Sequence, residues 1–290
     1  MKIKRSIGEH IFDTVNIILL ILVAFVTLYP FWYVLICSLS NPDLVIAGKV
    51  NWYPIGFELA SYKKAFEMPY IWTSYANTIF YSVVGTGISI FLTILSGYAL
   101  AKKRLHGRIF FTWVMLITMW FSAGLIPSYL NIKNLGLLNN RWTVVIAHAI
   151  SAFYVVLMRT YFESISDSLE ESAKMDGAND WLVLFKIYVP LSVPCIMTIA
   201  MYYFVGRWNE YFFAMLIMQD EAKLPLQVIL QKLIMQTRNI DPNQDMSDST
   251  LNQQTIIYAT IMVAALPMIC IYPFVQKFFV KGIMIGAVKG

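Results

Sequence analysis

Long uninterrupted runs of apolar residues dominate this chain of 290 residues. A helix needs about 20 apolar residues to cross the hydrocarbon core of a membrane, and helix is required there because lipid cannot satisfy unpaired backbone groups. Six runs reach this length, and they cover approximately residues 15–38, 76–100, 109–130, 142–161, 193–218 and 255–276. The sequence therefore predicts an all-α polytopic membrane protein with six transmembrane helices.

The composition supports the same class. Hydrophobic residues make up 58% of the chain and charged residues only 13%, whereas a soluble domain carries about 25% charged residues. A water-soluble globular enzyme and a disordered scaffold are therefore excluded. The lack of short segments with alternating polarity argues against an outer-membrane barrel.

The basic residues are distributed unequally between the two sides of the predicted membrane domain. Thirteen of the 22 Lys and Arg residues lie in the two terminal tails or close to the loops after the second and fourth spans, and eight lie in the other loops. Basic residues accumulate on the cytoplasmic side. We therefore expect two cytoplasmic tails, residues 1–14 and 277–290, around a transmembrane domain of residues 15–276. Because the net charge of +5 follows the membrane sides, we expect no nucleic-acid partner.

Two of the predicted external connections are too long to be turns. Residues 39–75 combine prolines with tryptophan and tyrosine residues, and we expect a structured cap at the membrane interface. Residues 219–254 begin with a stretch in which apolar residues recur at helical spacing from Leu226 onward, and continue into the polar run 241–245. This loop is either an interfacial helix with a solvated tip or a docking element for another protein.

The predicted cytoplasmic loop 162–191 carries the signals of a short isolated helix. Ser168 followed by Glu171 has the spacing of a capping box at a helix start. Gly177 supplies the left-handed residue that commonly ends a helix. We expect a helix of about two turns, about 12 Å long, that projects from the membrane.

The residues around this helix add further detail. Asn179 or Asp180 can cap a second helix, and Pro190 lies where that helix must give way to the next span. Ala173 has no side chain beyond Cβ, so it permits close approach of another protein.

The same loop contains a recognisable motif. Residues 171–178 read E-S-A-K-M-D-G-A, and residues 187–191 read I-Y-V-P-L. This pattern resembles the EAA motif, E-A-A-x-x-x-G followed by I-x-L-P, of permease subunits in binding-protein-dependent ABC importers. Ser172 replaces a motif alanine, and Val189 replaces the usual leucine. The D-G-A triplet is typical of the sugar-importing branch.

The resemblance extends over essentially the whole chain. Trp208-Asn209 and the C-terminal segment 276–290 agree with maltose-type carbohydrate permeases of the MalG and LplC type. The resemblance implies a type I ABC importer permease fold in a bacterial cell membrane. It also implies a non-catalytic transport subunit that forms half of the translocation path for an oligosaccharide, and the LplC-type likeness suggests a complex or acidic glycan.

The resemblance also implies the partners. They are a second homologous permease, an ABC ATPase dimer and an extracytoplasmic sugar-binding protein. No phosphate loop of the form G-x-x-x-x-G-K-[ST] occurs in the sequence. We therefore expect no cofactor in this chain, with ATP and Mg used by the partner ATPase.

Two groups of site residues follow from the resemblance. The helix in loop 162–191 matches the coupling helix, which sits in a groove on the ATPase. Its expected coupling residues are Leu169, Glu170, Glu171, Ser172, Ala173, Met175, Asp176 and Gly177. The loop 219–254 matches the loop that enters the binding-protein cleft. Its expected contact residues are Asn239, Ile240, Asp241, Pro242, Asn243 and Gln244.

Two ionisable residues lie deep in a predicted span. Arg207 and Glu210 are three residues apart, so they either neutralise each other as an ion pair or face the translocation path. On the second reading, the aromatic rings of this segment stack on sugar faces and its polar groups contact the sugar hydroxyls. The path candidates are Arg207, Trp208, Asn209, Glu210 and Tyr211.

An ion-coupled secondary transporter is the alternative function, and an intramembrane enzyme lacks the required residues. An ion-coupled secondary transporter usually shows internal repeats and several intramembrane charges, and neither is evident in this sequence. An intramembrane enzyme requires a catalytic constellation, and we find no paired aspartates, no HExxH and no nucleophile with a partner histidine. The three histidines are isolated and the three cysteines lie in apolar runs, so we expect no metal site.

Overall fold

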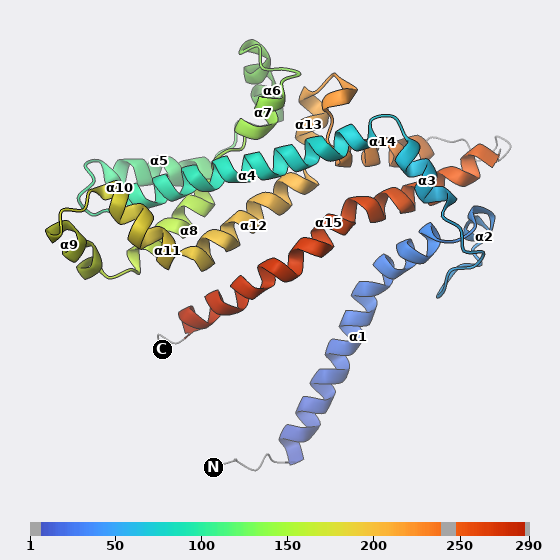
Figure 1. The fold of residues 1–290 in the computed structure, drawn as a ribbon, viewed down its shortest axis with the longest axis horizontal. Helices are drawn as coiled ribbons and strands as arrows, with labels where there is room; N and C mark the ends of the chain where they lie inside the picture. The colour runs from blue at the N-terminus through green and yellow to red at the C-terminus, as the bar shows by residue number, and fades with distance from the viewer. Residues whose placement is uncertain (1–6, 239–247, 288–290) are drawn as a thin grey trace. The chain divides into compact units, whose positions relative to one another are not determined.

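The computed structural model describes residues 7–238 and 248–287, and every regular element in these ranges is a helix. The chain divides into two compact units. One comprises the residues up to Pro69 together with Lys232–Leu266, and the other comprises Tyr70–Gln231 together with the residues from Pro267 onward. Figure 1 shows the helices in chain order. The all-α prediction is confirmed for the described residues.

The first unit begins with the long helix α1 (Ile7–Ser38), followed by the short helices α2 (Pro42–Ile46) and α3 (Ala60–Glu67). The large apolar side chains of α1 are exposed along most of its length. This is the surface expected of a helix that contacts lipid.

The segment after α1 is folded around a small buried cluster. Cys37 and Val50 belong to this cluster, and the hydroxyl of Ser40 accepts a hydrogen bond from the amide of Ile55 at 3.1 Å. The segment after α1 is thus folded, but residues 71–75 of the predicted cap belong to helix α4 (Ile71–Ala101), and an external cap at the membrane interface stays a prediction.

The second unit is organised around the continuous helix α4 (Ile71–Ala101). Helices α8 (Ala152–Glu163) and α12 (Val193–Asn209) pack along α4, and the three run side by side in Figure 1. The helices α14 (Leu226–Arg238) and α15 (Asp248–Ala287) each begin in one unit and end in the other. The remaining elements of the second unit are α5 (Arg108–Trp120), α6 (Leu125–Asn134), α7 (Arg141–Ile146), α8 (Ala152–Glu163), α9 (Asp167–Met175), α10 (Asp180–Val183), the π-helical turn η1 (Leu184–Tyr188), α11 (Val189–Leu191), α12 (Val193–Asn209), α13 (Phe212–Ile217) and the 3-10 turn η2 (Glu221–Lys223).

Two glycines of α4 allow its neighbours to approach closely. A Cβ atom at Gly97 would lie 2.9 Å from Cγ of Met158 on α8. A Cβ atom at Gly85 would lie 2.5 Å from Nη1 of Arg207 on α12. Both distances are shorter than a normal carbon contact, so these positions require glycine for the observed packing.

The six predicted spans are not six continuous helices. Three helices in the described ranges are long and apolar enough to cross a membrane, namely Gly8–Ser38, Ile71–Ala101 and Gln253–Pro273. Two further pairs of helices each have the length and composition of one span but are bent, which raises the number of spans to as many as five. The chain bends by 115° between α5 and α6, and by 82° between Asp180–Leu191 and α12. The structure therefore supports three to five spans by length and composition.

Each of three predicted spans is interrupted. The predicted span 109–130 breaks between α5 and α6, where Gly124 has a φ of 82°. The predicted span 142–161 breaks at residues 147–151, and the predicted span 193–218 breaks at Glu210–Tyr211. Apolar composition does not reveal such breaks, because they require polar partners for the freed backbone groups and composition does not show where those partners lie.

Candidate functional site

The helix predicted in loop 162–191 exists as α9, but it begins earlier than predicted. Its N-cap is Ser166, whose hydroxyl oxygen accepts a hydrogen bond from the amide of Ser168 at 3.4 Å. The predicted capping box of Ser168 and Glu171 is therefore wrong, because both residues lie inside the helix. Leu169 occupies the position three residues after the cap, and its side chain has no group that can complete a capping box.

The end of α9 is the one predicted. Gly177 has a φ of 82° and follows the last residues of the helix. The amide of Ala178 donates to the carbonyl of Ala173 at 2.9 Å, and the amide of Gly177 donates to the carbonyl of Lys174 at 3.0 Å. These two bonds form a Schellman motif, so α9 is closed at both ends by local bonds.

The chain after α9 turns back toward the membrane domain. Asn179, one of the two predicted candidates, caps α10 by accepting a hydrogen bond from the amide of Leu182 at 2.9 Å. The helical segment then continues through η1 and α11 and bends by 82° at Ser192, two residues after Pro190. The predicted end of the second helix near Pro190 is confirmed.

The structure divides the predicted coupling residues into two sets. Glu170 is only 8% exposed, and Ala173 packs against the buried cluster formed by α4, α8, α10, η1 and α12. Ala173 is therefore partly buried by the chain's own packing. The exposed set consists of Leu169, Glu171, Ser172, Met175, Asp176 and Gly177.

Glu170 lies at the centre of a cluster of donors. Its carboxylate forms an ion pair with Lys102 and accepts a hydrogen bond from Nζ of Lys174 at 2.6 Å. The hydroxyl of Tyr188 donates to the same carboxylate at 3.0 Å, and a guanidinium nitrogen of Arg104 lies 3.5 Å from it. This cluster joins α9 to the end of α4 and to η1.

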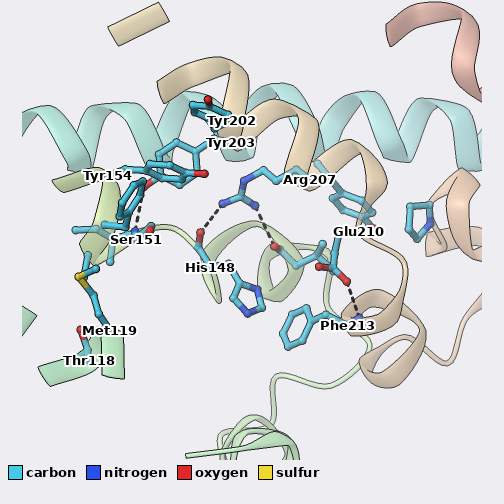
Figure 2. Close-up of a pocket in the computed structure, with 17 residues that line it drawn as sticks. Thr118, Met119, His148, Ser151, Tyr154, Tyr202, Tyr203, Arg207, Glu210 and Phe213 are labelled. Atoms are coloured by element: carbon cyan, nitrogen blue, oxygen red, sulfur yellow. Dashed lines mark hydrogen bonds between the residues drawn. The ribbon is translucent and has the colours of Figure 1, made fainter. Parts of the chain in front are cut away.

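A second candidate site is a cavity of about 650 Å³ within the second unit. Figure 2 shows aromatic rings along one part of its wall. The rings of Tyr154 and Tyr202 are almost parallel, with centroids 6.0 Å apart and an interplanar angle of 7°. His148, Ser151 and Glu210 add polar groups to the lining. In the described ranges no three His, Cys, Asp or Glu side chains converge as metal ligands.

Arg207 lies in the wall of this cavity and donates hydrogen bonds to neighbouring segments of the chain (Figure 2). Its Nη2 donates to Oγ of Ser89 at 2.9 Å and to the carbonyl of His148 at 3.0 Å, and its Nη1 donates to the carbonyl of Val144 at 3.3 Å. The two carbonyls lie at and beyond the end of α7, where helix carbonyls have no intrahelical partner. Arg207 therefore satisfies the backbone that the break in the predicted span 142–161 leaves free.

Glu210 has a different partner. Its Oε1 accepts a hydrogen bond from the amide of Phe213 at 2.9 Å, at the start of α13. Arg207 and Glu210 form no ion pair with each other in the described structure, so the ion-pair reading of the sequence is wrong. Both residues line the cavity instead.

The other three path candidates lie outside the cavity lining. Trp208 is 2% exposed and packs against the rings of Tyr75 and Phe204, and Asn209 and Tyr211 are exposed elsewhere. Helical periodicity explains why Trp208 and Asn209 lie elsewhere, since positions one and two residues from Arg207 do not share its face. Tyr211 lies beyond the end of α12, where this periodicity no longer applies.

Sequence reasoning missed several residues of the cavity. A spacing of four residues from Arg207 could have found Tyr203 on the same face of α12. The residues contributed by other elements carried no such signal. The missed residues include His148, Ser151, Tyr154, Tyr202 and Tyr203.

The amphipathic stretch predicted after residue 226 forms α14. Its first residue, Leu226, is fully buried, and its amide donates to the hydroxyl of Thr78 on α4 at 2.8 Å. The proposed tip that follows α14, with the expected binding-protein contacts at residues 239–244, lies outside the described residues.

Comparison with known proteins identifies the family of this chain. A family model described as "Binding-protein-dependent transport system inner membrane component" matches residues 4–285. The polygalacturonan/rhamnogalacturonan transport system permease protein YtcP of Bacillus subtilis (strain 168) is 38% identical over 97% of this chain and 99% of its own length. Protein LplC of the same organism is 38% identical over 97% of this chain and 96% of its own.

A solved structure agrees over the same extent. A chain of a bacterial ABC transporter involved in the import of the acidic polysaccharide alginate has a TM-score of 0.88 and 41% identity. The match covers 96% of this chain and 100% of the solved chain. With the family model covering almost the whole sequence, this chain belongs to the inner membrane components of binding-protein-dependent transport systems, as a multi-pass, non-catalytic ABC permease subunit whose ATPase is a separate protein.

Proposed function

We propose that this chain forms half of the translocation path for an oligosaccharide and that the 650 Å³ cavity is part of that path. The observation that carries the proposal is the lining, in which the parallel rings of Tyr154 and Tyr202 lie near Glu210 and Arg207. Aromatic rings match the apolar faces of sugars, while a few placed polar groups bond hydroxyls and fix orientation.

An acidic oligosaccharide is the proposed substrate. YtcP is named for polygalacturonan and rhamnogalacturonan, and the solved importer for the acidic polysaccharide alginate. In this chain the three hydrogen bonds from Arg207 all go to uncharged acceptors. A guanidinium retains its positive charge and bonds carboxylates strongly, so Arg207 provides a favourable site for a uronate carboxylate.

The exposed face of α9 is the proposed contact with the ATPase. Leu169 and Met175 are exposed apolar residues on this helix, with exposed fractions of 45% and 89%, and Glu171 offers a charge beside them. The N-cap and the Schellman motif stabilise α9 as a helix, so the residues of this face keep fixed relative positions. In this proposal Glu170 and Ala173 act through the chain's own packing, and Gly177 ends the helix.

The complete proposed assembly contains a second homologous permease, an ATPase dimer and an extracytoplasmic sugar-binding protein. Residues 239–244 are the proposed contact with the binding protein, since they follow α14, which is anchored at its first residue on α4. The proposed topology has six spans, three of them broken, and both termini in the cytoplasm.

The test is uptake by vesicles that contain the reconstituted importer and its binding protein. We expect uptake of trigalacturonate to require ATP inside the vesicle and to be unaffected by sodium or proton gradients. Arg207→Gln should lower uptake of trigalacturonate more than uptake of the neutral sugar maltotriose, if both are carried. Uptake driven by an ion gradient without ATP would favour a secondary transporter and contradict the proposal.

A further inference from the structure

Two neighbouring glutamates of α9 have opposite surroundings. Glu170 is 8% exposed and its carboxylate is bound by Lys102, Lys174 and Tyr188. Glu171 is exposed and forms no ion pair with any residue that the structure describes. Glu171 is thus available to another protein, whereas Glu170 connects α9 to the rest of its own chain.

Lys102 joins this connection to the end of α4. It is the C-cap residue of α4, and its Nζ lies 4.3 Å from the centre of the Tyr98 ring and 3.9 Å from the centre of the Tyr188 ring. Contacts with two aromatic faces restrict the ammonium group to the position where it meets Glu170. Only 12% of the Lys102 side chain is exposed, so solvent ions screen the pair weakly.

The middle of α4 is bonded to the cavity. Oγ of Ser89 accepts from Arg207 at 2.9 Å, and the hydroxyls of Thr93 and Tyr203 are 3.0 Å apart in a hydrogen bond. The hydroxyl of Tyr203 also accepts from the amide of Ser151, at the break before α8, at 3.0 Å. A displacement of α4 along its axis therefore acts directly on the cavity wall.

The first turns of α4 hold the segment that leads into α14. Nδ2 of Asn77 donates to the carbonyl of Leu224 at 3.1 Å, and the hydroxyl of Thr78 accepts from the amide of Leu226 at 2.8 Å. Because α4 is one unbroken helix of 31 residues, about 45 Å long, these contacts share one stiff element with Lys102.

We propose that Glu170 is a positioning residue that fastens α9 to α4, so that a displacement of α9 reaches the cavity and the start of α14 through α4. The proposal rests on the proposed function, because it takes α9 as the element that the ATPase moves. It assigns to Glu170 a role that Glu171 does not share. It also predicts that Lys102, although outside the motif, belongs to the same linkage.

A purely structural role for Glu170 makes a different prediction. If Glu170 only stabilised the fold, its loss would lower assembly and all activities together. If it transmits movement, the importer should assemble and hydrolyse ATP at its basal rate, while hydrolysis should respond less to the loaded binding protein. Coupling between two sites typically corresponds to a factor of about 5 to 150.

The experiment compares Glu170→Gln with Glu171→Gln, two isosteric changes one residue apart. We expect Glu170→Gln to retain ATPase co-purification and basal hydrolysis but to lose at least about fivefold in stimulation by the sugar-loaded binding protein, with a parallel loss of uptake. Glu171→Gln should instead reduce the amount of ATPase that co-purifies. Lys102→Met should reproduce the Glu170→Gln result, and the double variant should be no worse than the more affected single variant.

Lys103→Met is the matched control, because Lys103 adjoins Lys102 but is 83% exposed in the side chain and lies 3.7 Å from Asp167. Exposed pairs of this kind contribute little, so this variant should behave as the unmodified chain. Unchanged stimulation and uptake in Glu170→Gln would overturn the proposal, as would loss of ATPase co-purification in Glu170→Gln. Failure of the proposed function is distinct, since then no ATPase would co-purify with the unmodified chain.

Discussion

Arg207 keeps its position because Gly85, on the facing helix, has no side chain. The guanidinium fits into the space where a Cβ atom would stand, and from there it reaches Ser89 and the carbonyls of Val144 and His148. Its hydrogen bonds help to satisfy polar groups in a region of low dielectric, where an unpaired polar group is costly. The absence of a side chain at Gly85 thus leaves room for the Arg207 guanidinium in the cavity wall.

Gly85→Ala should therefore displace Arg207, destabilise the chain by about 1–3 kcal/mol and lower uptake. The matched control is Gly87→Ala on the same helix, where a Cβ atom meets nothing within 4 Å. In the control, alanine should be neutral or slightly stabilising, because its helix propensity exceeds that of glycine by about 1 kcal/mol. Thermal unfolding in detergent and vesicle uptake measure both effects. Equal stability of the two variants would show that Arg207 has room to move.

At the scale of the element, α9 is stable as a short helix because both of its ends are closed. Nine residues are too few for a helix to persist by propensity alone. The N-cap at Ser166, the Schellman motif at Gly177 and the ion cluster at Glu170 compensate for the shortness. A helix held at these three points can transmit a displacement without fraying.

Gly177→Ala is expected to loosen the end of α9. At a φ of 82° an alanine is strained by about 1–2 kcal/mol, although the position itself has open space around it. Ser172→Ala, on the exposed face of the same helix, serves as control and should have little effect. Hydrogen exchange of the amides in residues 167–178 should become faster in Gly177→Ala only. Equal exchange in both variants would mean that the glycine does not limit the stability of α9.

For the molecule as a whole, the proposed topology places α9 and the end of α4 in the cytoplasm and the segment after α1 outside the cell. The excess of basic residues on one side motivates this orientation. It also agrees with the division of labour proposed above, in which an ATPase contacts α9 from within the cell.

Cysteine labelling tests this orientation. In a background without Cys37, Cys195 and Cys270, a membrane-impermeant thiol reagent should label Lys63→Cys in right-side-out vesicles and Lys103→Cys only in inverted ones. Both positions are exposed, so access depends on the membrane side. Labelling of Lys103→Cys from outside would reverse the assignment.

Several features of this protein were determined by the sequence itself. Long apolar runs required a helical membrane protein, and the segment around Glu171 indicated the family that the comparisons confirm. Gly177 was correctly placed at a helix end, and Asn179 was one of the two candidates for the cap of the next helix. These features depend on the transfer of side chains to lipid or on bonds between residues a few positions apart, and both are visible in a linear pattern.

Only the tertiary structure decided where the predicted spans break and which glutamate is buried. The break at residues 147–151 exists because Arg207, far away in sequence, satisfies the carbonyls that the break leaves free. Glu170 faces inward because Lys102 and Tyr188, from two other elements, meet its carboxylate there. Buried polar groups need hydrogen-bond partners, and in both cases the partner lies tens of positions away in the sequence. A local sequence pattern does not show which distant residues the fold brings together.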